Sequence, residues 1–148
     1  MSNWFEGSNH IACTLADIVT SLEDLGTHYM GVVALMPGLS KVELVEQGSD
    51  FVTLRTNEGV MKRTNIAVDY GPDNIRIELD EVYEAGAAIT ATSHFVDEFT
   101  STADGVLHFT TISAVLAPGF LGFFYRKLGS ASIGNAYLRA YEAFFKTS

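Results

Sequence analysis

The chain has 148 residues, the usual size of one domain with one hydrophobic core, so we expect a single domain over residues 1–148. Hydrophobic residues make up 47% of it and charged residues 18%, which excludes an intrinsically disordered chain. The formal charge of −9 repels nucleic-acid phosphates and anionic lipid headgroups, and the single cysteine, Cys13, excludes an internal disulfide and a multi-cysteine zinc site.

The sequence carries no targeting, membrane or cofactor signal. The N-terminal region lacks a basic stretch followed by an apolar block, and no run approaches the roughly 18 apolar residues of a membrane span, so we expect a cytoplasmic protein without membrane insertion. No two of the four histidines have metal-ligand spacing. In GSASIGN, Asn135-Ala136 stands where a phosphate-binding loop has Lys followed by Ser or Thr. We therefore predict no metal and no cofactor.

The N-terminal part of the chain predicts one strand followed by two short helices. Polar and apolar residues alternate over Asn9–Leu15, the period of a half-buried strand. Apolar residues then recur at spacings of three and four over Ala16–Met36, where Thr20 and Glu23 have the spacing of a capping box. Interior glycines divide this segment into two helices, and Pro37-Gly38 ends it with a turn.

From Leu39 to Leu116 the chain predicts six strands joined by short turns. Turns of this length connect antiparallel neighbours and leave no room for a crossover helix. With the first strand, the sheet has seven strands. The six runs are LSKVELVEQ, FVTLRTN, VMKRTNIAVDY, NIRIELDEVY, AITATSHFVDEFTS and VLHFTTISAVL.

Turn positions predict which residues face each other in the last two hairpins. A turn about Ala103 and Asp104 pairs Phe95 with Ile112, Asp97 with Thr110 and Phe99 with His108. A turn about Gly86 pairs Ile77 with Phe95 and Glu78 with His94. The buried face then collects Val68, Tyr70, Ile75, Ile77, Leu79, Phe95, Phe99, His108 and Ile112. The solvent face collects Asp69, Arg76, Glu78, Asp80 and His94.

The last segment, Pro118–Phe145, has the apolar spacing of an amphipathic helix of about seven turns. Its centre, GSASIG, is made of small residues, and we interpret Gly129, Ala131 and Gly134 as an absence of bulk beneath a cavity. Phe124 and Leu128 would seal one side, and Leu138 and Tyr141 the other. On this interpretation Ala131→Phe blocks ligand binding more than it destabilises the fold.

This order of elements resembles a known architecture. The strand, two short helices, antiparallel meander and long closing helix, with Met36-Pro37-Gly38-Leu39 leading into VELVE and a final AYLRAYEAFF, resemble the helix-grip fold of the START-like superfamily. That superfamily, also called SRPBCC, includes polyketide cyclases, coenzyme Q-binding proteins and birch-pollen allergen relatives. The resemblance implies an α+β fold with a seven-stranded antiparallel sheet curved around the C-terminal helix. It also implies an apolar cavity between them for lipids, sterols, polyketides, quinones or related aromatics.

The inward residues are candidates for lining that cavity, although they could equally fill a solid core. Tyr137 and Tyr141 lie one helical turn apart, where their hydroxyls either orient a ligand or cover the seam between helix and sheet. The candidate ligand-binding residues are Tyr70, Ile77, Leu79, Phe95, Phe99, His108, Ile112, Phe124, Leu128, Ala131, Leu138 and Tyr141.

His108 and Asp97 form the one candidate acid-base pair. A carboxylate beside an imidazole could make a general base, or the two could be a hydrogen-bonded pair that meets no substrate, so no residue is assigned as catalytic.

Three functions remain open. The first is a binding or carrier protein, monomeric or homodimeric, for a small hydrophobic or aromatic ligand. The second is a cyclase, aromatase or dehydratase that uses His108 with Asp97. The third is a partner-binding module in which exposed aromatics such as Trp4 and Phe5 dock onto another chain or a second copy.

Overall fold

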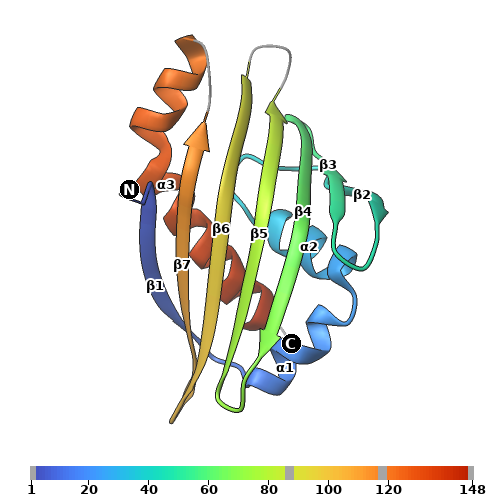
Figure 1. The fold of residues 1–148 in the computed structure, drawn as a ribbon, viewed down its shortest axis with the longest axis vertical. Coiled ribbons are helices and arrows are strands. Elements are labelled where there is room, and N and C mark those ends of the chain that lie inside the picture. The colour runs from blue at the N-terminus through green and yellow to red at the C-terminus, as the bar shows by residue number, and fades with distance from the viewer. Residues whose placement is uncertain (1–2, 86–88, 117–119, 147–148) are drawn as a thin grey trace.

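The computed structural model describes residues 3–85, 89–116 and 120–146, and it describes their side chains except at 85, 89, 120–128 and 130. Seven antiparallel strands form one sheet in the order β1-β7-β6-β5-β4-β3-β2, and all three helices lie on the same side of it (Figure 1). The predicted α+β helix-grip class is confirmed. The elements are β1 (Phe5–Ile11), α1 (Leu15–Leu22), α2 (Leu25–Val33), β2 (Glu43–Gln47), β3 (Val52–Arg55), β4 (Gly59–Tyr70), β5 (Asn74–Ala85), β6 (Ile89–Thr102), β7 (Gly105–Leu116) and α3 (Phe120–Lys146).

The first strand and its capping signal lie earlier than predicted. β1 ends at Ile11, so the prediction of a strand up to Leu15 is wrong. Thr14 caps α1 instead: its Oγ1 accepts from the Asp17 amide at 3.2 Å, and Asp17 Oδ2 accepts from the Thr14 amide at 2.9 Å. This reciprocal pair is the capping box, and the box predicted at Thr20 is wrong because that residue lies inside α1.

The two short helices are confirmed, but glycines do not separate them. α2 begins after Asp24, whose side chain accepts from the Thr27 amide at 3.1 Å. The side chain of Asp24 thus satisfies an amide at the start of α2 that has no acceptor within the helix, and this cap separates α2 from α1. Gly26 and Gly31 both lie within α2.

Of the two predicted hairpin registers, one is correct and one is displaced. β6 and β7 pair as predicted, with Asp97 opposite Thr110 and Phe99 opposite His108. Between β5 and β6, Phe95 pairs with Leu79 and not with Ile77, a displacement of two residues along the strand. Because side chains alternate with a period of two, this displacement leaves every residue on its predicted face.

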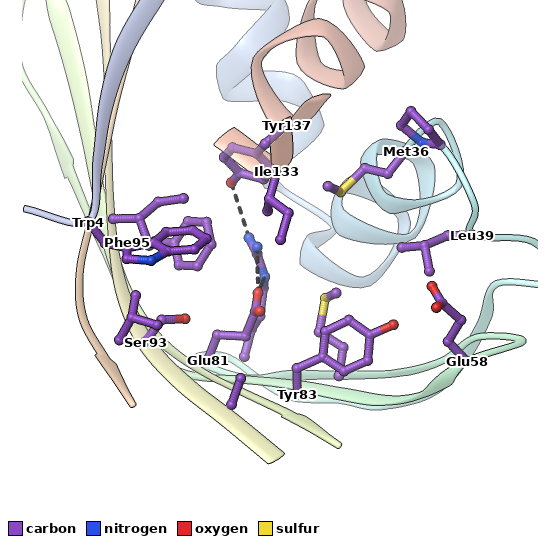
Figure 2. Close-up of a pocket in the computed structure, with 16 residues that line it drawn as sticks. Trp4, Met36, Leu39, Glu58, Glu81, Tyr83, Ser93, Phe95, Ile133 and Tyr137 are labelled. Carbon is purple, nitrogen blue, oxygen red and sulfur yellow. Dashed lines mark hydrogen bonds and ion pairs between the residues drawn. The ribbon is translucent and has the colours of Figure 1, made fainter. Parts of the chain in front are cut away.

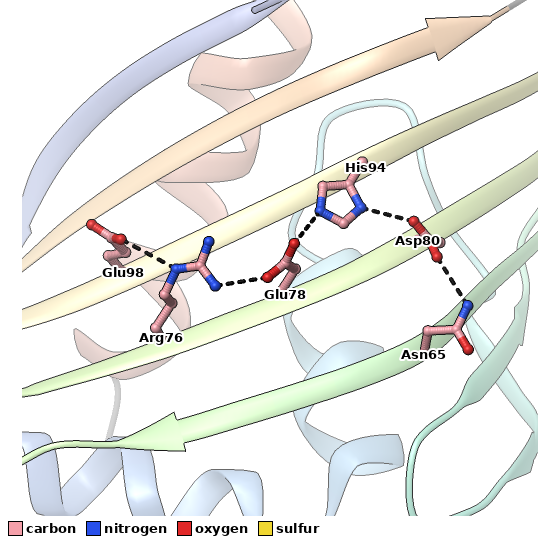
Figure 3. Close-up of polar contacts among 6 residues, drawn as sticks. All are labelled: Asn65, Arg76, Glu78, Asp80, His94 and Glu98. Atoms are coloured by element: carbon pink, nitrogen blue, oxygen red, sulfur yellow. Dashed lines mark hydrogen bonds and ion pairs between the residues drawn. The ribbon is translucent and has the colours of Figure 1, made fainter.

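The two faces of the sheet therefore carry the side chains expected of them. Ile75, Ile77, Leu79, Phe99 and Ile112 are all buried. The outer face carries a chain of polar contacts in which His94 Nε2 lies 2.7 Å from Glu78 Oε2 and His94 Nδ1 lies 2.8 Å from Asp80 Oδ1 (Figure 3). The hydrogen bond with Asp80, together with Glu78, raises the pKa of His94.

The centre of α3 packs closely against β1. A Cβ atom at Gly134 would lie 2.3 Å from Phe5 Cδ1, so the absent side chain makes room for the Phe5 ring. Phe5 is buried there, so the expectation that its ring is exposed for docking is wrong. Ala131 is exposed. The interpretation of Gly134 as empty space beneath a cavity is therefore wrong. In the described residues, no helix is both long enough and apolar enough to cross a bilayer.

Candidate functional site

A pocket of about 290 Å³ lies where β4 begins and β5 ends, between the sheet, α3 and the segment that follows α2. Figure 2 shows Tyr137 and Ile133 of α3 facing Glu81 and Tyr83 of the sheet, with Met36 and Leu39 closing the far side. Pro37 is exposed at the rim. The pocket is lined by Trp4, Met36, Pro37, Leu39, Glu58, Met61, Arg63, Glu81, Tyr83, Ala91, Ser93, Phe95, Ile112, Val115, Ile133 and Tyr137.

Strand periodicity explains most of this lining, since alternate residues of β4, β5 and β6 point inward. β7 contributes two side chains to the lining only because it contains a β-bulge. Its register against β6 shifts between Thr92 and His94, and Ala114 has a φ of 53°. The extra residue reverses the alternation, so Ile112 and Val115, three positions apart, both reach the pocket.

A buried ion pair forms the floor of the pocket. Arg63 donates to Glu81 Oε2 from Nε at 3.0 Å and from Nη2 at 2.7 Å, and from Nη1 to Tyr137 Oη at 3.1 Å. Arg63 is only 2% exposed. Burial opposes its charge, but Tyr137 and Glu81 outweigh that effect and raise the pKa of Arg63 well above its ordinary value. The guanidinium therefore stays charged.

Aromatic rings enclose the guanidinium of Arg63. Its Cζ atom lies 4.7 Å from the Phe95 ring centroid, 4.9 Å from that of Tyr29 and 5.2 Å from that of Tyr137. At these distances each ring makes a cation–π interaction with the guanidinium, and the three interactions together fix the position of Arg63.

Tyr137 links this floor to a second buried group. Its hydroxyl donates to Asp97 Oδ2 at 2.9 Å, while Asp97 Oδ1 lies 2.7 Å from His108 Nε2 and accepts from Thr110 Oγ1 at 2.7 Å. Burial alone would raise the pKa of Asp97, but His108, Thr110 and Arg63 together lower it. Hydrogen bonds thus connect Glu81, Arg63, Tyr137, Asp97 and His108 in one buried polar chain.

Asp97 and His108 lie in contact, as the pairing predicted, but neither lines the pocket. Phe99 stacks on the His108 ring with centroids 4.5 Å apart, and the Tyr141 ring lies 4.6 Å away. The side chains of Asp97 and His108 are both fully buried. A molecule in the pocket would meet Tyr137 and Arg63 before it met His108.

The structure separates the predicted ligand-binding residues into several groups. Phe95 and Ile112 line the pocket. Tyr70 is 57% exposed, because it ends β4 at the edge of the sheet away from the pocket. Ala131 is exposed outside the lining, and the side chains of Phe124 and Leu128 lie outside the described residues. The remaining candidates are buried but absent from the lining: Ile77, Leu79, Phe99, His108, Leu138 and Tyr141.

Sequence reasoning missed the charged floor. Glu81 and Tyr83 continue the inward series of Ile75, Ile77 and Leu79 on β5, and Arg63 follows Met61 in the same way on β4. A charged residue at an inward position is the signal that could have found them, because buried charges require partners.

No family model and no curated protein matches the chain. Solved structures do match. An uncharacterised protein from Rhizobium leguminosarum aligns with a TM-score of 0.67 at 14% identity, covering 97% of this chain and 94% of that one. The human StarD13 lipid transfer and protein localization domain aligns with a TM-score of 0.56 at 13% identity, covering 95% and 75%.

The chain has the START-like helix-grip fold. A third match is the di-domain ARO/CYC StfQ from the steffimycin biosynthetic pathway, with a TM-score of 0.53 at 13% identity, covering 97% of this chain and 50% of that one. At these identities the likeness concerns the START-like fold alone, so the function of this chain depends on its own pocket.

Proposed function

We propose that this START-like protein binds a small, ring-containing, mostly apolar molecule in the pocket between the sheet and α3, as a binding or carrier protein. The observation that carries the proposal is the pocket of about 290 Å³, which has aromatic and aliphatic walls and a floor fixed by Arg63 and Glu81. Ligand sites are typically mostly apolar, with a few fixed polar groups. The similar fold of the StarD13 lipid transfer and protein localization domain supports the same class of function.

The volume of the pocket limits the size of the molecule. It is roughly twice the 150 Å³ apolar cavity that accepts benzene, and it stands at the lower end of the range for ligand sites. A molecule of one to three rings fits these dimensions better than a diacyl lipid does.

A fluorescence titration with N-phenyl-1-naphthylamine, a neutral dye that brightens in apolar surroundings, tests the proposal. We expect saturable binding by the wild-type chain at one site. Ala91 is buried beside the pocket, so Ala91→Phe would occupy the space and abolish the signal without unfolding the protein. Unsaturable or absent binding by the folded wild-type chain would overturn the proposal.

A cyclase-type enzyme is the second candidate, and the placement of Tyr137 supports it. Tyr137 lines the pocket, and its hydroxyl accepts from Arg63 and donates to Asp97, so it could take a proton from a ligand while passing its own proton to Asp97, which His108 holds in place. The similar fold of the ARO/CYC protein StfQ supports this second candidate. His108→Ala should then abolish turnover of a poly-β-ketone while N-phenyl-1-naphthylamine still binds. Unchanged turnover would remove His108 from the mechanism.

A further inference from the structure

Beside the floor of the pocket lie two polar atoms that have no hydrogen-bond partner among the described residues. Both hydrogen bonds that Glu81 accepts end on Oε2, and within the described part of the chain Oε1 accepts none. Ser93 is the cross-strand partner of Glu81 and lines the pocket, and its hydroxyl has no partner among the described residues. A carboxylate oxygen and a hydroxyl therefore stand side by side on β5 and β6, facing the pocket.

Arg63, in contrast, has little capacity left for a ligand. Three of its N–H groups are already donated to Glu81 and Tyr137, and rings of Phe95, Tyr29 and Tyr137 lie against its guanidinium. Two of the five N–H groups of a guanidinium remain, and an anionic ligand would reach them only between these rings, beside the carboxylate of Glu81.

The charges around the pocket also favour a ligand that donates a hydrogen bond over a ligand that accepts one. One cation, Arg63, faces two carboxylates in the lining, Glu81 on the floor and Glu58 at the rim. A third carboxylate, Asp97, lies directly behind Tyr137. The surroundings of a ligand are thus net negative, which disfavours a second anion and favours a hydrogen-bond donor or a cation.

We propose, on the basis of the proposed function, that the pocket selects apolar ring molecules that carry an N–H, O–H or ammonium donor, and rejects the matching carboxylates. Glu81 Oε1 accepts from the donor and Ser93 Oγ forms the adjacent hydrogen bond. A site built around a buried acceptor discriminates strongly against a ligand that cannot donate, because the acceptor then loses water without gaining a partner.

Four two-ring probes of nearly equal size separate the alternatives: 2-naphthol, 2-naphthylmethylamine, 2-methoxynaphthalene and 2-naphthoate. Isothermal titration calorimetry at pH 7 should give dissociation constants for the naphthol and the ammonium about tenfold or more below that of methoxynaphthalene, the usual effect of a hydrogen bond to a charged acceptor. Naphthoate should bind more weakly than methoxynaphthalene. A preference of the ammonium over the naphthol would assign part of the selectivity to charge, and equal binding of the two would assign it to the hydrogen bond.

Two variants locate the selectivity. Glu81→Gln should reduce the affinity for 2-naphthylmethylamine and increase that for naphthoate, because Arg63 loses its counter-ion. Ser93→Ala keeps the ion pair intact and should weaken naphthol binding several-fold. Thr90→Ala, on an exposed residue of β6, is the matched control and should change neither. If Glu81→Gln does not fold, Ser93→Ala and the four probes still decide the question.

The outcomes separate this inference from the proposed function. Equal binding of all four probes, or tightest binding of naphthoate, overturns the selectivity and leaves the ligand pocket standing. Failure of all four to bind overturns both.

Discussion

The space between the sheet and α3 has two ends that are built differently. At the closed end, Phe99, His108 and Tyr141 are fully buried and pack ring against ring, and His28 Nε2 lies 2.8 Å from the Tyr141 hydroxyl. At the open end, the inward residues of β6 become small, with Ala91 and Ser93 in the lining. The open space of the pocket therefore lies over small residues of the sheet, whereas Gly134 of the helix packs on Phe5.

The buried polar chain from Glu81 to His108 lies between the two ends. Each charged group in it, Arg63, Glu81 and Asp97, has hydrogen-bond partners within the chain of contacts, as buried charges require. It therefore serves as the floor of the open end and as part of the packing of the closed end, and mutations on either side of it should have different effects.

Truncation of the closed end should produce the largest loss of stability. Phe99→Ala removes a fully buried ring, so we expect a loss of about 3–5 kcal/mol in the free energy of unfolding by urea denaturation. The matched truncation at the open end, Ile133→Ala, concerns a half-buried side chain beside empty space and should cost about 1 kcal/mol. Equal losses would contradict the distinction between the ends.

Removal of the central cation should have the next largest effect. Arg63→Met leaves Glu81 and Asp97 buried without their cation, and we expect a loss of about 3 kcal/mol. The double variant Arg63→Met with Glu81→Met should recover much of this loss, because it removes a charge left unpaired. A double variant less stable than the single one would show that the ion pair is itself strongly stabilising.

The closed end should also respond to pH through His28. Burial lowers the pKa of His28 to about 3, whereas the unfolded chain has an ordinary value near 6.5. A lowered folded pKa means that the stability is fully present above about pH 6.5 and is lost as the pH falls toward about 3, by up to about 1.4 kcal/mol per pH unit.

Unfolding free energies of the wild type and of His28→Gln between pH 7 and 5 test this dependence. The variant should be less stable at pH 7 but should lose less stability on acidification. Parallel curves would show that His28 does not carry the pH dependence.

Mutation of His94 on the outer face should have the smallest effect on stability, and the pH dependence of that effect should be opposite in sign to that of His28. The pKa of His94 is raised by Asp80 and Glu78, so its contribution is present below about pH 6.5 and lost as the pH rises through the folded value. These groups are partly exposed, so His94→Gln should cost well under 1 kcal/mol at pH 6 and less at pH 8. A larger loss at pH 8 than at pH 6 would reverse the assigned sign.

Strand periodicity predicted most of the fold, and its errors are informative. Phe95 pairs with Leu79 and not with the predicted Ile77, but the predicted faces were still correct because the register error is an even number of residues. The N-cap at Thr14 was missed because the polar-apolar alternation that predicts a strand continues through the capping residue.

The site was harder to predict because it depends on which inward residues fill space. Alternation cannot tell Ile77, which packs in the core, from Glu81, which faces a pocket. The small residues of α3 suggested a cavity, but only the position of Phe5 against Gly134 shows why bulk is absent there.

One substitution made at two alanines tests the central claim most directly. Ala91 on β6 is buried in the pocket lining, and Ala131 on α3 is exposed outside it. We expect Ala91→Phe to abolish N-phenyl-1-naphthylamine binding and Ala131→Phe to leave it within about twofold of the wild type, with both variants folded by circular dichroism. Loss of binding in Ala131→Phe with retention in Ala91→Phe would place the ligand site along the helix and contradict this account.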